Sequence, residues 1–296
     1  MSDPLVRLYP AAYRAAYGQE IVDVHREMTA DLPRTARLRA DADLVAHALR
    51  VRLGLDSASP AGRFFALAAP FALAADAVVS GLHLTRWYAE LVVSPAPVRV
   101  QLSTMEGPWA LSLLFSLLVC LGAVIALTGR WVPGVGVAVC GLLGRAVLWT
   151  VAVPVPGEGA FAPVAAALLT TAVVPACPAD RRGDRGLSAA AGVMAGVAWF
   201  PLVVVHTGAF GVTTDYGAWP MLVLAFTGAA VALRSRSSGL REFGAMAAAS
   251  PPLVAYAYTK VWADPLPTLG VLLLLPVTAV GTAACQAVRR RRRLGV

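Results

Sequence analysis

The chain has 296 residues, of which 58% are hydrophobic and 14% charged, with a formal net charge of +8 at pH 7. A soluble domain usually contains about 25% charged residues, so this composition excludes an ordinary soluble domain and indicates an all-α, polytopic helical membrane protein. The positive charge does not indicate nucleic-acid binding, because the arginines lie in short segments between apolar runs, where they set membrane topology.

Long apolar runs begin only after the first 60 residues, which divides the chain into three predicted parts. Residues 1–60 form a small cytoplasmic helical prefix, residues 61–288 a transmembrane domain, and residues 289–296 a basic cytoplasmic tail. The prefix lacks the apolar stretch of a cleavable signal peptide. We therefore expect it to be part of the mature protein.

The prefix is predicted to contain two main helices. Aromatic and apolar residues recur at steps of three or four over residues 9–28, which places them on one helix face. Gly18 interrupts this face, and we expect a bend or a helix end there. Leu32 and Pro33 end the segment, and a second helix is predicted over 35–53. Two short helices make a marginal core, so burial would be completed by the membrane domain, a second copy or a partner.

A short motif stands out in the first predicted helix. The motif and its predicted docking face comprise Tyr9, Pro10, Tyr13, Arg14, Tyr17, Gly18 and Glu20. This pattern resembles the N-terminal helical prefix of some bacterial permease-type proteins and of uncharacterised actinobacterial multi-pass membrane proteins. The resemblance covers only the start of the chain, and it implies a cytoplasmic prefix on a membrane protein rather than a particular activity.

About eight segments are predicted to span the membrane. Six are strongly apolar: 109–127, 131–153, 160–177, 187–206, 216–233 and 266–288. Two are weaker, namely 64–84 and 243–262, because both contain proline and the first also contains Asp76. At about 1.5 Å per residue, the strong segments are long enough to cross or nearly cross a hydrocarbon core of roughly 30 Å.

The distribution of basic residues predicts the orientation of these segments. If all eight span and the N-terminus is cytoplasmic, only Arg86, Arg99 and Lys260 fall in outer loops, out of 25 basic residues. Such an excess on one side is typical of the cytoplasmic face, so both termini are predicted to be cytoplasmic. An interfacial or re-entrant position for residues 64–84 stays open as the alternative. The arginine-rich, lysine-poor composition suggests a GC-rich bacterium. In a bacterium, a multi-pass helical protein is expected in the plasma membrane.

The longest predicted outer loop covers residues 85–108. Its Trp87 and Tyr88 suit the headgroup region of a bilayer, so the loop is expected to be an interfacial element. His206 and Asp215 lie near another outer end. They are candidates for the border of an external cavity, although ordinary solvated residues are the simpler interpretation.

Two charged residues fall inside predicted spans, where ionisable groups are costly. Asp76 and Arg145 lie at similar predicted depths in the first and third spans, so we expect an ion pair between them. A functional polar site and separate solvation are the alternatives. Ser188, Gly192 and Gly196 form a small-residue ridge that lets another helix approach closely, and internal packing is favoured over dimerisation. A second such ridge is offered by Gly134, Gly136, Gly141 and Gly144.

The sequence contains none of the common catalytic or metal-binding motifs. There is no HExxH, no P-loop, no G-x-S-x-G and no Cys/His spacing typical of a metal site, so no catalytic residue, metal or cofactor is predicted. We expect a non-enzymatic regulatory or permease-like subunit in the lipid bilayer, whose prefix docks a cytoplasmic protein. The alternative is a transporter of a hydrophobic or weakly polar solute.

Overall fold

The computed structural model describes residues 4–152, 158–206, 218–235, 239–260 and 265–294. These residues form helices joined by short connections, and no strand occurs among them. They divide into two compact units, Met1–Arg63 and Phe64–Val296. The all-α prediction is therefore confirmed for the described part of the chain.

The first unit contains a short 3-10 helix, η1 (Pro4–Leu8), and two longer helices, α1 (Ala11–Thr29) and α2 (Arg34–Arg52). The second predicted helix is confirmed to within one residue at each end. The predicted helix end at Gly18 is wrong, because α1 continues through this residue without interruption, whereas the predicted bend is not tested. The break falls at Pro10 instead, whose extended backbone (φ −56°, ψ 148°) separates η1 from α1.

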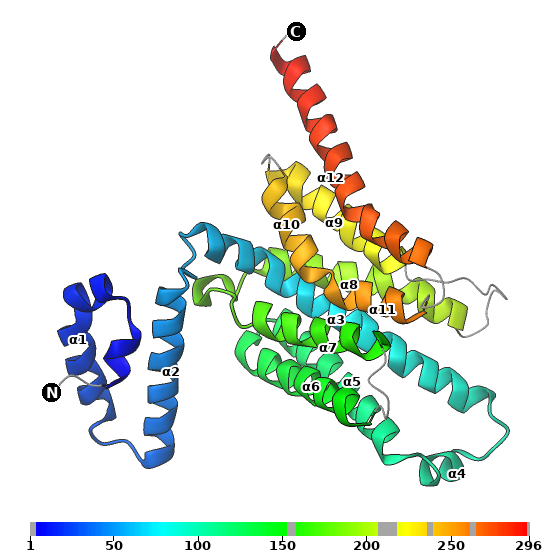
Figure 1. The fold of residues 1–296 in the computed structure, drawn as a ribbon, viewed down its shortest axis with the longest axis horizontal. Coiled ribbons are helices and arrows are strands. Elements are labelled where there is room, and N and C mark those ends of the chain that lie inside the picture. The colour runs from blue at the N-terminus through cyan, green and yellow to red at the C-terminus, as the bar shows by residue number, and fades with distance from the viewer. Residues whose placement is uncertain (1–3, 153–157, 207–217, 236–238, 261–264, 295–296) are drawn as a thin grey trace. The chain divides into compact units, whose positions relative to one another are not determined.

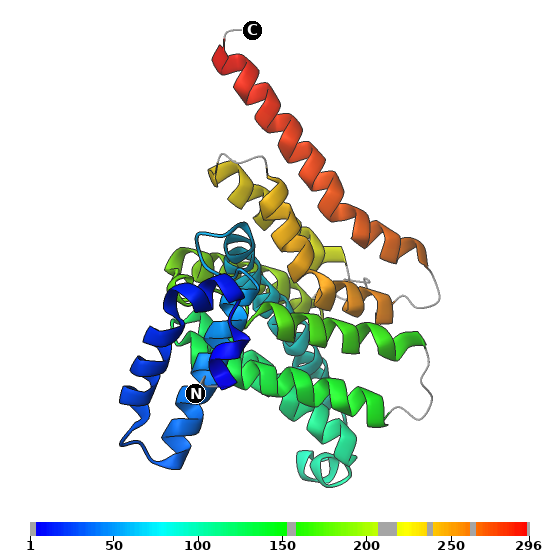
Figure 2. The same cartoon turned by 60° about the vertical axis from the view of Figure 1, so that its left-hand side comes forward.

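The short helix η1 keeps the two longer helices apart at one end. It packs against both α1 and α2, and Figures 1 and 2 show it in dark blue between them. Val6 and Tyr9 fill this junction and are 8% and 2% exposed. Away from it, much of the apolar surface of the two helices stays uncovered, including Met28 and Leu38.

The second unit is a bundle of helices. They are α3 (Pro60–Val93, from Phe64 onward), α4 (Val98–Ser103), α5 (Gly107–Leu127), α6 (Trp131–Ala152), α7 (Glu158–Val173), η2 (Ala179–Arg181), α8 (Arg185–His206), α9 (Ala218–Ser235), α10 (Leu240–Ala249), α11 (Pro251–Lys260) and α12 (Pro265–Leu294). Among the described residues, five helices are long and apolar enough to cross a membrane: α3, α5, α6, α9 and α12. This indicates an integral membrane protein.

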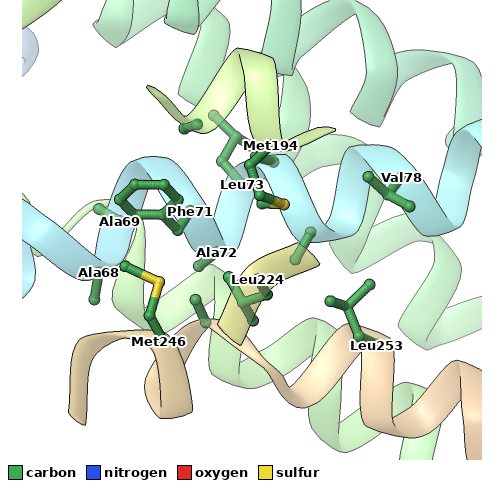
Figure 3. Close-up of a cluster of buried hydrophobic side chains, with 14 of the residues drawn as sticks. Ala68, Ala69, Phe71, Ala72, Leu73, Val78, Met194, Leu224, Met246 and Leu253 are labelled. Atoms are coloured by element: carbon green, nitrogen blue, oxygen red, sulfur yellow. The ribbon is translucent and has the colours of Figure 1, made fainter. Parts of the chain in front are cut away.

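One of the two weaker predicted segments, 64–84, forms the centre of this bundle. In α3, 83% of the residues in the most apolar stretch are buried, against 11% in α12, which packs beside α9 (Figures 1 and 2). Figure 3 shows Met194 of α8 beside Leu73 of α3, with Met246 of α10 beside Ala68. Alanine explains this role, because it favours the helix and lets neighbouring helices approach closely.

Helix α3 is also longer than predicted. It continues nine residues past position 84 and ends at Val93, so the first part of the predicted loop 85–108 is helical. The short helix α4 occupies much of the rest. At about 1.5 Å per residue the whole helix is about 51 Å long, more than the roughly 30 Å hydrocarbon core.

The other weak segment, 243–262, is a broken helix. It consists of α10 and α11, which are separated at Ser250 just before the prolines at 251 and 252. The missing proline N–H groups explain the break, and the Ser250 hydroxyl donates a hydrogen bond to the carbonyl of Ala247 (2.9 Å). Within the membrane such a break is tolerated where protein covers it, and Ser250 is 8% exposed.

Of the two small-residue ridges that the sequence offers, the structure packs the one on α6 and not the one on α8. Ser188 is buried, but a Cβ on Gly192 or Gly196 would have open space, so the predicted packing ridge does not hold there among the described residues. The close approach is between α5 and α6, where a Cβ on Gly122 or Gly134 would lie 2.6 Å from the carbonyl oxygen of the other. Small residues with helical spacing mark a possible contact, but not which helix uses it.

Candidate functional site

Tyr9, which lies between η1 and α1, forms a ladder of aromatic rings with Tyr13 and Tyr17 of α1. Tyr9 stacks on Tyr13 with ring centroids 5.3 Å apart, and Tyr13 is followed by Tyr17 at 5.0 Å. The Tyr9 hydroxyl lies 2.7 Å from Nδ1 of His47 on α2, within hydrogen-bonding distance. The second helix of the prefix therefore covers the first tyrosine, whereas Tyr17 is 50% exposed.

An open groove continues from this ladder between α1 and α2. It has a volume of about 480 Å³, and its α1 wall is formed by the tyrosines followed by Ile21, Val24 and Met28. Val24 and Met28 are 48% and 64% exposed. Side chains of this kind are stabilised by about 1.5–3 kcal/mol each when they are fully buried, so the groove is a favourable surface for an apolar partner.

The charges that line the groove are acidic. Glu20 of α1 and Asp43 of α2 belong to the lining, which contains no arginine or lysine among the described residues. His25 also lines it, and its Nε2 lies 2.9 Å from the Asp41 carboxylate. Arg14 of the motif instead donates a hydrogen bond to the Arg7 carbonyl (3.3 Å). A ligand with basic groups beside an apolar face would complement this lining.

Titratable groups at the closed end of the groove favour their neutral forms. Burial raises the pKa of Tyr9, and the neighbouring phenol of Tyr13 raises it further. Burial lowers the pKa of His47, and the positive charge of Arg50 acts in the same direction. At neutral pH the junction between η1, α1 and α2 is therefore held by uncharged side chains.

In the membrane unit, Asp76 of α3 and Arg145 of α6 line one small cavity. The cavity has a volume of about 30 Å³ and is enclosed by α3, α6, α7 and α11. Asp76 and Arg145 are 2% and 6% exposed. Arg145 donates a hydrogen bond to Oγ of Ser80 (2.9 Å), and Thr170 of α7 is close enough to interact with the Asp76 carboxyl group.

The structure brings the two predicted charges together without a close contact between them. They interact electrostatically, but no nitrogen–oxygen distance of 4.0 Å or less joins them among the ion pairs of the described residues. Asp76 Oδ2 has no hydrogen-bond partner among the described residues. Direct pairing stays a prediction, now between two groups that share a cavity with room for water but not for a larger solute.

Sequence reasoning missed the other polar members of this cavity. His83 lies on the same side of α3 as Asp76, and Tyr256 and Thr259 come from α11. The spacing of Asp76, Ser80 and His83 at i, i+4 and i+7 was the available signal, since it places all three on one helix face. Nothing in the sequence indicated that α11 would supply the opposite wall.

The predicted external-cavity residues, His206 and Asp215, lie at or beyond the edge of the described residues. Asp215 lies outside the described residues, and His206 is the last residue of α8 with a side chain that is not described. Among the described residues, no group of three His, Cys, Asp or Glu side chains is placed to hold a metal ion. In comparisons with known proteins, no protein-family model, no curated protein and no solved structure matches this chain.

Proposed function

We propose that the protein is a non-enzymatic membrane subunit whose cytoplasmic prefix binds an amphipathic helix of a partner protein in the groove between α1 and α2. The groove itself carries this proposal. It is apolar, it is open, and it lies in the prefix, outside the apolar helices that are suited to a bilayer. Helix-in-groove binding is a common mode of peptide recognition.

The length and charge of the groove support a helical occupant. Its α1 wall extends about 22 Å from Tyr13 to Met28, at about 1.5 Å per residue, which matches about four turns of a partner helix. Glu20 and Asp43 favour a helix with arginine or lysine beside its apolar stripe. Tyr17 and Met28, each at least half exposed, supply the apolar anchors.

Site-specific photocrosslinking in the full chain tests this proposal. With a photoreactive amino acid in place of Met28, we expect one discrete adduct in native membranes, joined to a peptide with apolar residues at helical spacing and flanking Arg or Lys. Glu20→Arg should reduce the adduct several-fold. Glu27→Arg is the matched control, because Glu27 lies on the same helix but outside the groove lining.

Three results would contradict the docking proposal. They are the absence of an adduct, an adduct only with a second copy of this chain, and equal adduct formation in the two charge variants. Deletion of residues 1–55 should abolish the association without removing the protein from the membrane. A variant that loses its adduct because the prefix unfolds would also lose protection of α1 and α2 amides from hydrogen exchange, which separates the two causes.

The alternative function, transport of a hydrophobic or weakly polar solute, has less support around Asp76 and Arg145. Their cavity of about 30 Å³ is far smaller than the roughly 300–1,000 Å³ of small-molecule sites. We propose eight spans with both termini cytoplasmic in a bacterial plasma membrane, in which α10 and α11 together form one crossing. The position of the arginines in the sequence supports this topology.

A further inference from the structure

A second groove lies in the membrane unit and is independent of the prefix. It has a volume of about 580 Å³ and is open between α3, α5 and α8. Its α3 wall extends from Ala77 to Tyr88, and Val124 of α5 and Gly196 of α8 lie on the other walls. The volume falls within the roughly 300–1,000 Å³ that is typical of small-molecule sites.

The polar side chains along this groove are bonded to the protein and leave an apolar surface for a ligand. Trp199 donates its Nε1–H to Oγ1 of Thr85 (3.2 Å), and the Thr85 hydroxyl donates to the Gly81 carbonyl (2.8 Å). The Cys120 thiol donates to the Ala77 carbonyl (3.6 Å). These bonds disfavour a polar solute, since it would find no partners along the walls.

One polar group in the lining differs from the others. The Tyr88 hydroxyl, at the end of the α3 wall, has no hydrogen-bond partner among the described residues, and its side chain is 57% exposed. Tyrosine is enriched where membrane proteins meet the headgroup layer. The groove therefore has an apolar body and one polar end.

The length of the groove matches one leaflet of a bilayer. From Ala77 to Tyr88 the α3 wall rises about 16 Å at about 1.5 Å per residue. Half of a hydrocarbon core of about 30 Å is about 15 Å. A single extended lipid chain would fit this length with its polar head at Tyr88.

We propose that the groove between α3, α5 and α8 binds one hydrocarbon chain of a membrane amphiphile, whose polar head lies at Tyr88. Two glycines shape the site. A Cβ on Gly81 would lie 3.0 Å from Nε1 of Trp199, so glycine lets this ring approach α3, whereas a Cβ on Gly196 would point into open space. A large side chain at position 196 would consequently occupy the space of the lipid chain without disturbing a packed contact.

Photolabelling of the full chain in vesicles tests the site. The vesicles contain phosphatidylethanolamine and phosphatidylglycerol with a trace of phosphatidylcholine that carries a diazirine midway along one acyl chain. We expect mapped adducts to concentrate on the groove walls and to exceed those on the lipid-accessible face of α12. Gly196→Phe should lower the groove adducts on the order of tenfold.

Gly192→Phe is the matched control, because it lies one turn away on α8, also faces open space and does not line the groove. It should leave the labelling unchanged. Val124→Phe fills the groove from α5 and should reproduce the loss, which covers the case in which Gly196→Phe fails to fold. Equal labelling in all variants, or uniform labelling of every exposed helix, would overturn the proposal. Spontaneous disulfide-linked dimers of Gly196→Cys, in a chain whose native cysteines are replaced by alanine, would do so too, because a second copy would then occupy the groove.

Discussion

At the scale of single residues, His47 makes the stability of the prefix depend on pH. Its pKa lies below the ordinary value of 6.5 because the ring is partly buried and close to Arg50. As the pH falls through this range, the unfolded prefix therefore binds a proton before the folded one does, and the free energy of unfolding decreases. His47→Gln should remove most of this dependence, since glutamine does not titrate.

Hydrogen exchange of the full chain measures this effect. After correction for the intrinsic pH dependence of exchange, amides of α2 should lose protection between pH 7.5 and pH 5.5 in the wild type and much less in His47→Gln. The His25–Asp41 pair, with its atoms 2.9 Å apart, is the other histidine contact between these helices. An unchanged pH dependence in His47→Gln would refute the prediction.

A second prediction at this scale concerns Arg145. Removing one of two buried opposite charges leaves the other uncompensated, at a cost of about 3–5 kcal/mol, so Arg145→Met should strongly destabilise the protein. The double variant Asp76→Asn with Arg145→Met should recover much of the loss. Ser80→Ala removes only the hydrogen-bond acceptor of Arg145 and should cost about 1 kcal/mol. Thermal unfolding in a mild detergent compares these variants and the single variant Asp76→Asn with the wild type, and additive effects of the two charge substitutions would show that the charges are not coupled.

At the scale of helices, the contact between α5 and α6 depends on glycine at one position and not at its neighbour. Gly134 faces the backbone of α5 with no room for a side chain, whereas a Cβ on Gly136 meets no atom within 4 Å. Gly134→Val should therefore destabilise the protein by about 1–3 kcal/mol through overpacking. Gly136→Val makes the same change in helix propensity and should be nearly neutral. Equal unfolding temperatures for the two variants would disprove this interpretation.

The helices also show which structural features a sequence pattern can predict. Periodicity predicted α2 closely, because a helix face and its proline boundary are local properties. The helix end that it predicted at Gly18 does not occur, since glycine lowers helix propensity by only about 1 kcal/mol and neighbouring contacts outweigh that cost. Gly192 and Gly196 on α8 and Gly134 on α6 all belong to runs of small residues at helical spacing. Only the arrangement of the helices decides that Gly134 contacts a neighbouring backbone and that the other two do not.

At the scale of the whole molecule, the proline and the charged Asp76 that made residues 64–84 look like a weak span have a physical explanation. Polar and charged side chains in a span are tolerated where they face the interior of the bundle, and α3 is covered by other helices along most of its length, so it can carry Asp76 and Ser80 on one face. The mean hydropathy of its most apolar stretch, 1.8, is close to the 1.9 of the peripheral helix α12, so hydropathy alone does not distinguish the central helix. The polar cavity around Asp76 and Arg145 was also only partly predictable. Both charges were visible in the sequence, but the walls from α7 and α11 depend on tertiary packing.

The topology of the whole chain follows if α3 crosses the membrane completely. With the four native cysteines replaced by alanine, single cysteines at Asp31 and Gly183 should resist a membrane-impermeant maleimide in intact bacterial cells. A cysteine at Pro95, between α3 and α4, should react, because an odd number of crossings separates it from the other two. The reagent should label all three after the cells are permeabilised. Equal labelling of positions 31 and 95 in intact cells would instead mean that α3 enters and leaves the membrane on one side. That result would also overturn the cytoplasmic assignment of either the prefix or the loop at Gly183.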